Sequence, residues 1–278
     1  MRARSGLLLS AVVAVGAWGC DEARSPATGP APSYIVNGAN TGSAYPAVGA
    51  LLFDYNRDGV VDGDDELCTG SLIAPTVFLT AAHCVYPDSY TPAGSQFYVS
   101  FEPDLYASPL TYITATGYVW DPAYGHDQAD LRDLAVILLP GGSTDGITPV
   151  RLPAAGILDA LRAKGGLNGR LFVNVGYGTS ATRTGVPGFP YDGRRKSSRS
   201  GFMALQPTWL GLLMNTMATG EGGDCYGDSG GPKFLDGDAT TIYATVTSGD
   251  SPCRATTWDW RLDTPAARAF LGRFVALP

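Results

Sequence analysis

The sequence has few histidines, no excess of positive charge and, after its first residues, no long apolar run. Because no later segment is apolar enough to cross a bilayer, we expect a mature protein that is soluble apart from any anchor. The formal net charge of −7 argues against nucleic acid as a partner. The chain has only 2 histidines, so imidazole chemistry would fall to His83 or His126. No internal repeat is visible.

Glycine and proline are abundant, with 36 and 20 residues, and the apolar runs are short. This pattern favours short strands and turns over long helices, in one or two ordinary domains. We expect helices over Ala155–Ala163 and from Pro265 to about Phe274, the second capped by Thr264. The polar stretch Thr179–Ser200 reads as a long surface loop. The expected strands lie in residues 47–53, 72–82, 97–101, 112–119, 134–139, 171–175 and 242–247. Two small β-barrels, the first ending near Pro153, suit this order.

The N-terminus has the pattern of an export signal. Two arginines precede the apolar stretch Leu7–Trp18, which is too short for a stable membrane span. Cys20 follows it directly and is the natural odd cysteine among 5. Residues 17–20 resemble a bacterial lipoprotein signal, so we expect a lipidated Cys20; the alternative is an ordinary cleaved signal. We therefore interpret residues 1–20 as a signal and 21–34 as a tether or propeptide, and expect a secreted or cell-envelope protein, with outer-membrane attachment through the lipid.

A glycine-rich hexapeptide surrounds a candidate nucleophile. In Gly227-Asp228-Ser229-Gly230-Gly231-Pro232, the glycines allow a tight turn. Such a turn would point the N–H groups of Gly227 and Ser229 at one spot, where they could stabilise an oxyanion. The alternative is a glycine-rich turn with an incidental serine.

A base and an orienting carboxylate are also available. His83 follows an apolar run and two small alanines, whereas His126 lies in a polar segment with no supporting pattern. Asp133 leads directly into an apolar strand, and the nearby Asp127 and Asp130 do not. A serine needs such a base, and the base needs an orienting partner. The alternatives are a buried core histidine and a carboxylate that only starts a strand.

The motifs TAAHC, DLAV and GDSGGP, in this order, resemble those of the chymotrypsin/trypsin family of serine proteases from Ile35 to Pro278. The resemblance implies an all-β fold of two antiparallel six-stranded barrels, at about 35–153 and 167–263, with a C-terminal helix at about 265–274. The active site would lie in the cleft between the barrels. His83 would act as general base and then acid, Asp133 would orient it, and Ser229 would attack the peptide carbonyl. The implied disulfides are Cys68–Cys84 and Cys225–Cys253.

The segment Ile35-Val36-Asn37-Gly38 resembles the activation site of the same family. Cleavage before Ile35 would free an α-amino group that pairs with Asp228 and orders the oxyanion hole. The alternative is a simple first strand. Because Tyr34 precedes the cut, we expect either self-cleavage or a protease that prefers aromatic residues.

The resemblance does not extend to a trypsin-like substrate pocket. Gly223 occupies the place of the trypsin aspartate that binds Arg or Lys, and Asp224 follows it. The wall segment, with Thr247 and Gly249, lacks the usual tryptophan. The Asp224 carboxylate could face the pocket or point away. We predict an endopeptidase without strict specificity, leaning away from tight trypsin-like cleavage.

A second constellation precedes Cys68. The segment from Asp54 to Asp65 resembles the calcium loop of EF-hands and dockerins, with Gly59 at the sharp turn. The alternative is a solvated acidic hairpin. We expect a structural calcium ion, whereas catalysis itself needs no cofactor. The expected ligands are Asp54, Asn56, Asp58, the Val60 carbonyl, Asp62 and Asp65.

The sequence is compatible with three functions. The first is an active, exported serine endopeptidase that acts as a monomer on protein or peptide substrates. The second is a catalytically silent homologue that uses the cleft for binding. The third is a surface adhesion module built on the anchor and the calcium loop. All three catalytic residue types are present, which favours the first.

Overall fold

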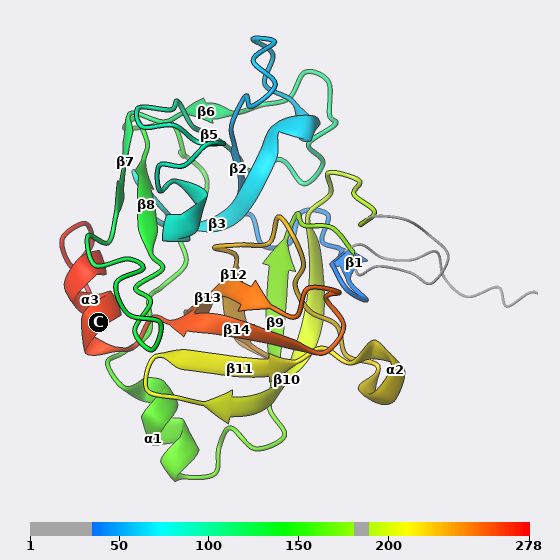
Figure 1. The fold of residues 1–278 in the computed structure, drawn as a ribbon, viewed down its shortest axis with the longest axis vertical. Helices are drawn as coiled ribbons and strands as arrows, with labels where there is room; N and C mark the ends of the chain where they lie inside the picture. Colours follow the sequence, from blue (N-terminus) through cyan, green and yellow to red (C-terminus); the bar gives the residue numbers. More distant parts are fainter. Residues whose placement is uncertain (1–34, 181–188) are drawn as a thin grey trace, which may run out of the picture. The chain divides into compact units, whose positions relative to one another are not determined.

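The computed structural model describes residues 35–180 and 189–278, and antiparallel strands form most of its regular structure (Figure 1). One sheet has the order β6-β5-β2-β3-β4-β8-β7. Its two end strands, β6 and β7, are separated by only two residues, so they form one bent strand and the sheet corresponds to the expected six-stranded barrel. The strands are β2 (Val48–Leu52), β3 (Glu66–Ala74), β4 (Val77–Thr80), β5 (Tyr98–Ser100), β6 (Ile113–Thr114), β7 (Gly117–Trp120) and β8 (Ala135–Leu138).

The second sheet has the order β1-β10-β11-β14-β13-β12-β9, and β9 also pairs with β10. That extra pairing closes six strands into a barrel, to which the two-residue β1 is added. The first residues of the domain therefore join the second barrel, not the first as the expected boundary at residue 35 implied. The strands are β1 (Ala39–Asn40), β9 (Leu171–Gly176), β10 (Lys196–Leu205), β11 (Trp209–Leu213), β12 (Pro232–Leu235), β13 (Ile242–Gly249) and β14 (Thr256–Arg261).

Helices are short. They are α1 (Ile157–Ala163), α2 (Thr216–Thr219) and α3 (Pro265–Leu271), and two 3-10 turns lie at Gly63–Asp65 and Ala82–Cys84. As predicted, the Thr264 side chain caps α3 by accepting a hydrogen bond from the Ala267 N–H, with Pro265 at the start. Phe270 and Leu271 of α3 are buried in the largest hydrophobic cluster, beside residues of both barrels. In the part of the chain that the structure describes, no helix is long and apolar enough to span a membrane.

The sequence-based prediction misses the strands β11, β12 and β14 and the short helix α2, and it is wrong for two further segments. The run 72–82 is not one strand, because a turn at residues 75–76 separates β3 from β4. The stretch 179–200 is not a surface loop throughout: residues 181–188 lie outside the described residues, but 196–200 form part of β10. Arg195 is only 2% exposed, and its guanidinium donates to the carbonyls of Val48 and Phe101 in the first barrel. Arg195 therefore has a structural role and does not belong to a solvated loop.

Candidate active site

Strand pairing brings the candidate base and its carboxylate together. Thr80 of β4 pairs with Ala135 of β8, so His83, three residues beyond one strand, meets Asp133, two residues before the other. Asp133 is fully buried. Its Oδ2 lies 2.8 Å from His83 Nδ1, and its Oδ1 accepts the His83 backbone N–H at 2.9 Å. Two contacts to one carboxylate fix both the position and the ring orientation of the histidine.

The electrostatics of His83 favour a proton on the ring. Its side chain is 33% exposed. Burial alone would lower the pKa of His83, but the charge of Asp133 and the hydrogen bond to it outweigh burial and leave the pKa raised. An imidazolium formed when the ring accepts a proton is therefore stabilised where it forms.

The segment that carries Ser229 is a tight turn held on both sides. Gly231 N–H donates to the Asp228 carbonyl at 2.8 Å, and Thr69 N–H donates to the Ser229 carbonyl at 2.9 Å. Gly227 and Gly230 have φ values of 97° and 78°, a region that favours glycine. A Cβ on Gly230 would also lie 2.3 Å from Thr80 Oγ1. The positive φ favours glycine at both positions, and at Gly230 there is also no space for a Cβ.

Ser229 and His83 line the same cleft, which has a volume of about 310 Å³. Within residues 35–180 and 189–278, the N–H groups of Gly227 and Ser229 donate to no protein acceptor. The same described residues contain no hydrogen bond between Ser229 Oγ and the His83 ring, a contact that often tightens only when substrate binds. The arrangement offers a nucleophile, an oriented base and two free N–H donors at one site.

Asp228 is buried behind this turn. Its two carboxylate oxygens accept the N–H groups of Gly178 and Cys225, each at 2.9 Å. Burial, with the charge of Asp224, raises the pKa of Asp228 to about 8 despite those donors. No salt bridge to Asp228 is present among the described residues. Burial and the charge of Asp228 also raise the pKa of Glu66 well above its ordinary value.

The start of the domain reaches this region. Ile35 is fully buried, and Val36 forms an antiparallel bridge with Gly223 through two hydrogen bonds of 3.0 Å. Gly223 opens the segment that carries Asp228 and Ser229. The expected activation residues therefore lie beside the catalytic segment; Tyr34 and Cys20 lie outside the described residues.

Three of the four expected pocket residues line the cleft: Asp224, Thr247 and Gly249. Gly223 is not among the lining residues; it packs against Met214, since a Cβ there would lie 2.5 Å from the Met214 sulfur. Asp224 lines the cleft, but its carboxylate pairs with the fully buried Lys233. Sequence reasoning missed Lys233, which pairs with Asp224. The sequence around Lys233 gives no sign that this residue is buried.

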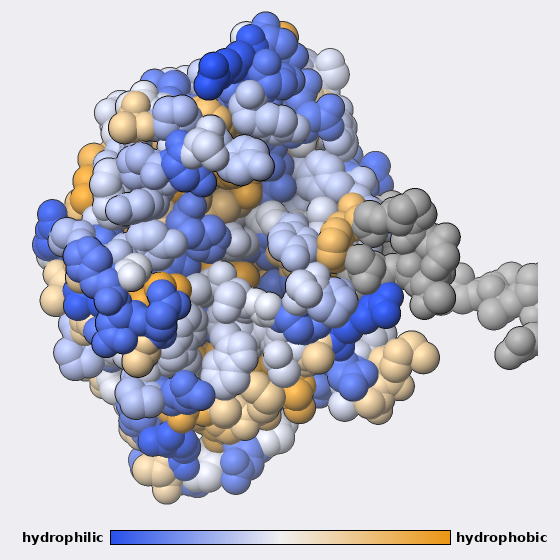
Figure 2. All heavy atoms as spheres, in the orientation of Figure 1, coloured by the Kyte–Doolittle hydropathy of each residue, from blue (hydrophilic) through white to orange (hydrophobic). Residues whose placement is uncertain are grey.

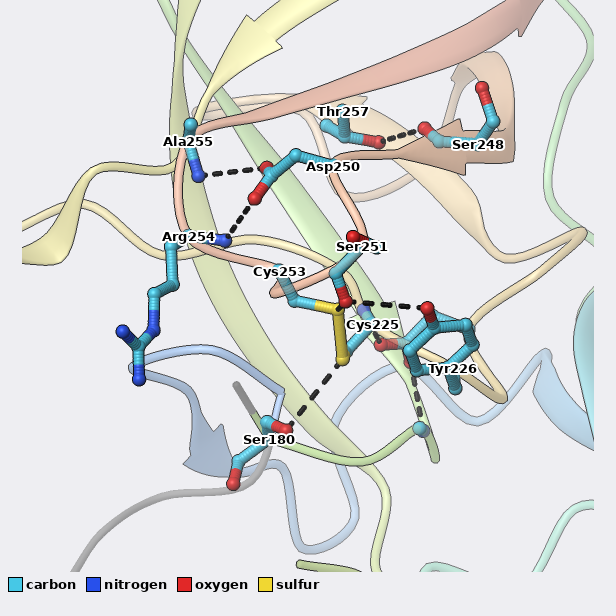
Figure 3. The surroundings of a disulfide bond; sticks show 12 residues. Ser180, Cys225, Tyr226, Ser248, Asp250, Ser251, Cys253, Arg254, Ala255 and Thr257 are labelled. Atoms are coloured by element: carbon cyan, nitrogen blue, oxygen red, sulfur yellow. Dashed lines mark hydrogen bonds between the residues drawn. A yellow bond between two sulfur atoms is a disulfide. The ribbon is translucent and has the colours of Figure 1, made fainter. Parts of the chain in front are cut away.

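Both disulfides implied by the resemblance are present. Cys68–Cys84 joins β3 to the turn that holds His83, and Cys225–Cys253 joins the Ser229 segment to the loop after β13. Figure 3 shows the second bridge beside Tyr226, whose hydroxyl donates to the Ser251 carbonyl. Asp250 fixes the same loop by accepting the N–H groups of residues 254–256. The disulfide and the Asp250 hydrogen bonds thus hold the loop after β13, which forms one wall of the cleft.

The acidic loop projects at the top of Figure 1, where the surface is strongly hydrophilic in Figure 2. Gly59 N–H donates to Asp54 Oδ2 at 3.1 Å, and Asp58 N–H donates to Asn56 Oδ1 at 2.9 Å. Asp65 is fully buried, and its Oδ1 has no partner among the described residues.

The loop carboxylates do not converge tightly. Of the residues that the structure describes, only Cys68, His83 and Cys84 bring three potential metal-binding side chains within 4.8 Å of one another. The two cysteines of that group form a disulfide and are not free to bind metal. Any cation in the acidic loop would also need the Asn56 side chain and the Val60 carbonyl as ligands.

Comparisons with known proteins agree with this architecture. The family model described as trypsin matches residues 41–259. The structure of HL collagenase is similar at a TM-score of 0.61 and 21% identity, covering 86% of this chain and 97% of that one. Human heparin binding protein has a TM-score of 0.60 at 17% identity, with coverage of 87% and 96%. Neuropsin, a serine protease of mouse brain, has a TM-score of 0.60 at 18% identity, with coverage of 86% and 99%. No curated protein matches the chain.

Proposed function

We propose that this chain, which belongs to the trypsin family, is a serine endopeptidase with Ser229 as its nucleophile. The observation that carries the proposal is the His83–Asp133 pair, at 2.8 Å, in the same cleft as Ser229. The family as a whole supports proteolysis of protein or peptide substrates. Because one structural neighbour is named for heparin binding, the fold alone does not establish catalysis.

The proposed reaction uses each group in turn. His83 takes the proton from Ser229 Oγ as that oxygen attacks the substrate carbonyl carbon. The N–H groups of Gly227 and Ser229 hold the oxyanion of the tetrahedral intermediate. His83 then gives its proton to the leaving amine, which departs and leaves an acyl-enzyme. Water, deprotonated by His83, hydrolyses the ester and returns Ser229 to its starting state.

Covalent labelling tests the proposal directly. A chain that begins at Ile35 is treated with an organophosphonate, and the modified residue is located by mass spectrometry. We expect one adduct, on Ser229, and none in Ser229→Ala. Absence of the adduct in the correctly folded chain would favour a silent homologue that uses the cleft for binding. A peptide-library cleavage profile of the same chain then gives its substrate preference.

Activation by cleavage before Ile35 is part of the proposal. Its support is the buried Asp228 carboxyl, which has no salt bridge in the described residues, and the bridge from Val36 to the same segment. A freed α-ammonium would supply the missing positive charge. The uncut chain should therefore react with the phosphonate much more slowly than the chain that begins at Ile35. Equal rates would reject this part of the proposal.

The acidic loop is proposed to hold a structural calcium ion. Support comes from Asp65, whose unpartnered buried oxygen would be satisfied by a cation. Calorimetric titration with calcium should give binding to the wild type and to Asp145→Ala, an exposed acid outside the loop. Binding should be lost in Asp58→Ala. Flat traces for all three proteins would reject the site.

Export and anchoring through Cys20 complete the proposal. The support is the N-terminal sequence alone, since these residues lie outside the described part of the chain. Mass spectrometry of the mature N-terminus is the test. A diacylglyceryl-modified Cys20 is expected, and an unmodified start beyond Cys20 would rule out the lipid.

A further inference from the structure

A buried lysine lies behind Asp224, one of the residues that line the cleft. We call Asp224, Lys233 and Asp259 together the floor of the cleft. Lys233 lies on β12 and is fully buried. Its ammonium donates to Asn174 Oδ1 at 2.8 Å, pairs with Asp224 Oδ2, and lies 3.4 Å from Asp259 Oδ1. Each of the three ammonium protons therefore has an acceptor. Since a buried ammonium is costly without such partners, the position of Lys233 is fixed by this network.

Asp224 is the member of the network that reaches the cleft. It is 5% exposed and lines the cleft together with Thr257. The Thr257 hydroxyl is turned toward the Ser248 carbonyl and Asp259 Oδ1. A substrate side chain that enters here lies beside Asp224, whose carboxylate is bound to Lys233.

The charges of this floor nearly cancel. Asp259 is fully buried, and its Oδ2 has no partner among the described residues, so an ionised form is costly. Burial raises the pKa of Asp259 to about 8, although Lys233 opposes the shift. In the uncut chain Asp228, with a pKa of about 8, also carries no net charge at neutral pH, and in the chain that begins at Ile35 its charge would be balanced by the α-ammonium. What remains is one carboxylate, Asp224, and one ammonium, Lys233.

We infer that Lys233 is a specificity-determining residue: it cancels the charge of Asp224, so the cleft prefers an uncharged side chain over Arg or Lys at the residue before the cleaved bond. This inference rests on the proposed endopeptidase function. A guanidinium that enters the cleft loses hydration, and a floor with no net charge does not compensate for that loss. The Asp224 carboxylate without Lys233 would instead favour Arg or Lys before the cleaved bond.

The test changes the floor by one charge at a time. Two peptides differ only in having arginine or its uncharged isostere citrulline before the cleaved bond, and the measured quantity is the ratio of their kcat/KM values. We expect a ratio of one or below for the wild type. Lys233→Met, which leaves Asp224 unpaired, should raise the ratio about tenfold or more. Asp224→Asn, which leaves the lysine in excess, should lower it and favour Glu over Gln at the same position.

Two further variants act as controls. Asp259→Asn keeps the Asp224–Lys233 pair and should leave the ratio within about twofold of the wild type. The double variant Asp224→Asn/Lys233→Met restores a neutral floor and should return the ratio to the wild-type range. If Lys233→Met does not fold, Asp224→Asn carries the test. A wild type that strongly prefers arginine, or variants with unchanged ratios, would overturn the inference.

The labelling experiment separates the two levels of failure. A wild type that is labelled at Ser229 but shows no charge dependence refutes only the role of Lys233. A folded wild type that begins at Ile35 and is not labelled refutes the endopeptidase itself.

Discussion

Replacing Asp133 by asparagine tests the geometry of the site most sharply. Asp133 Oδ1 accepts the backbone N–H of His83, and Oδ2 faces Nδ1. An asparagine that keeps the first bond must place its NH₂ group against Nδ1. That nitrogen then has to accept, so the proton moves to Nε2, and the ring can no longer take a proton from Ser229.

The expected loss follows from this tautomer. A wrong tautomer at such a site lowers kcat by about 10⁴-fold, or about 5 kcal/mol of barrier. The charge that raises the pKa of His83 is also removed. The acid limb of the kcat/KM profile, which the raised pKa of His83 sets in the wild type, should therefore move to lower pH.

The assay is the pH dependence of peptide hydrolysis, with active sites counted by phosphonate titration. The matched control is Asp263→Asn, a fully buried aspartate that pairs with Arg261 at 3.0 Å. The control should lose stability but keep activity per active site within about threefold. The reasoning is wrong if Asp133→Asn stays within tenfold of the wild type, or if both variants lose activity equally.

Three further predictions concern stability, measured by chemical denaturation in the Ser229→Ala background. Because the pKa of Asp228 is raised to about 8, the uncut chain should lose stability as pH rises from 4 to 8, and a free Ile35 amine should reduce that loss; parallel curves would contradict it. Gly230→Ala should cost about 2–4 kcal/mol, against about 1 kcal/mol for Gly237→Ala, whose added Cβ meets nothing within 4 Å; similar costs would contradict the steric argument. Removing the Cys68–Cys84 bridge, which spans 16 residues, should cost about 3 kcal/mol, and an unchanged midpoint would refute this.

Most strands of the first barrel were predictable because their determinants are local, whereas only β9 and β13 of the second barrel were predicted, and the two-barrel fold followed from the family resemblance. Short apolar runs bounded by glycine and proline marked those strands, and Thr264 with Pro265 marked the start of α3. The predicted ends were less accurate: α3 stops at Leu271, and the N–H groups of Arg273 and Phe274 donate to carbonyls three residues back instead of four. The placement of β1 on the second barrel was not predictable, since two residues carry no periodic signal.

The buried charges were the least predictable part. Arg195 and Lys233 occur in sequence contexts that suggest a solvated loop and an ordinary strand. Their burial depends on acceptors that the fold brings to them. Arg195 donates to the Val48 carbonyl, 147 residues away in the chain, and Lys233 of β12 pairs with Asp259 of β14, a strand that β13 separates from β12. Pattern analysis along the chain cannot find such partners, because they are set by how the strands pair and close.

This difference explains why the sequence gives a specific hypothesis for the reacting residues and a weaker one for the substrate. The reacting groups need a fixed order of small motifs, since Gly230 must fit against Thr80 and His83 must follow directly after β4. The substrate preference depends on the net charge beside the cleft, which one buried lysine on β12 can cancel. Asp224, which precedes Ser229 by 5 residues in the sequence, therefore carries little information about substrate charge until its pairing with Lys233 is known.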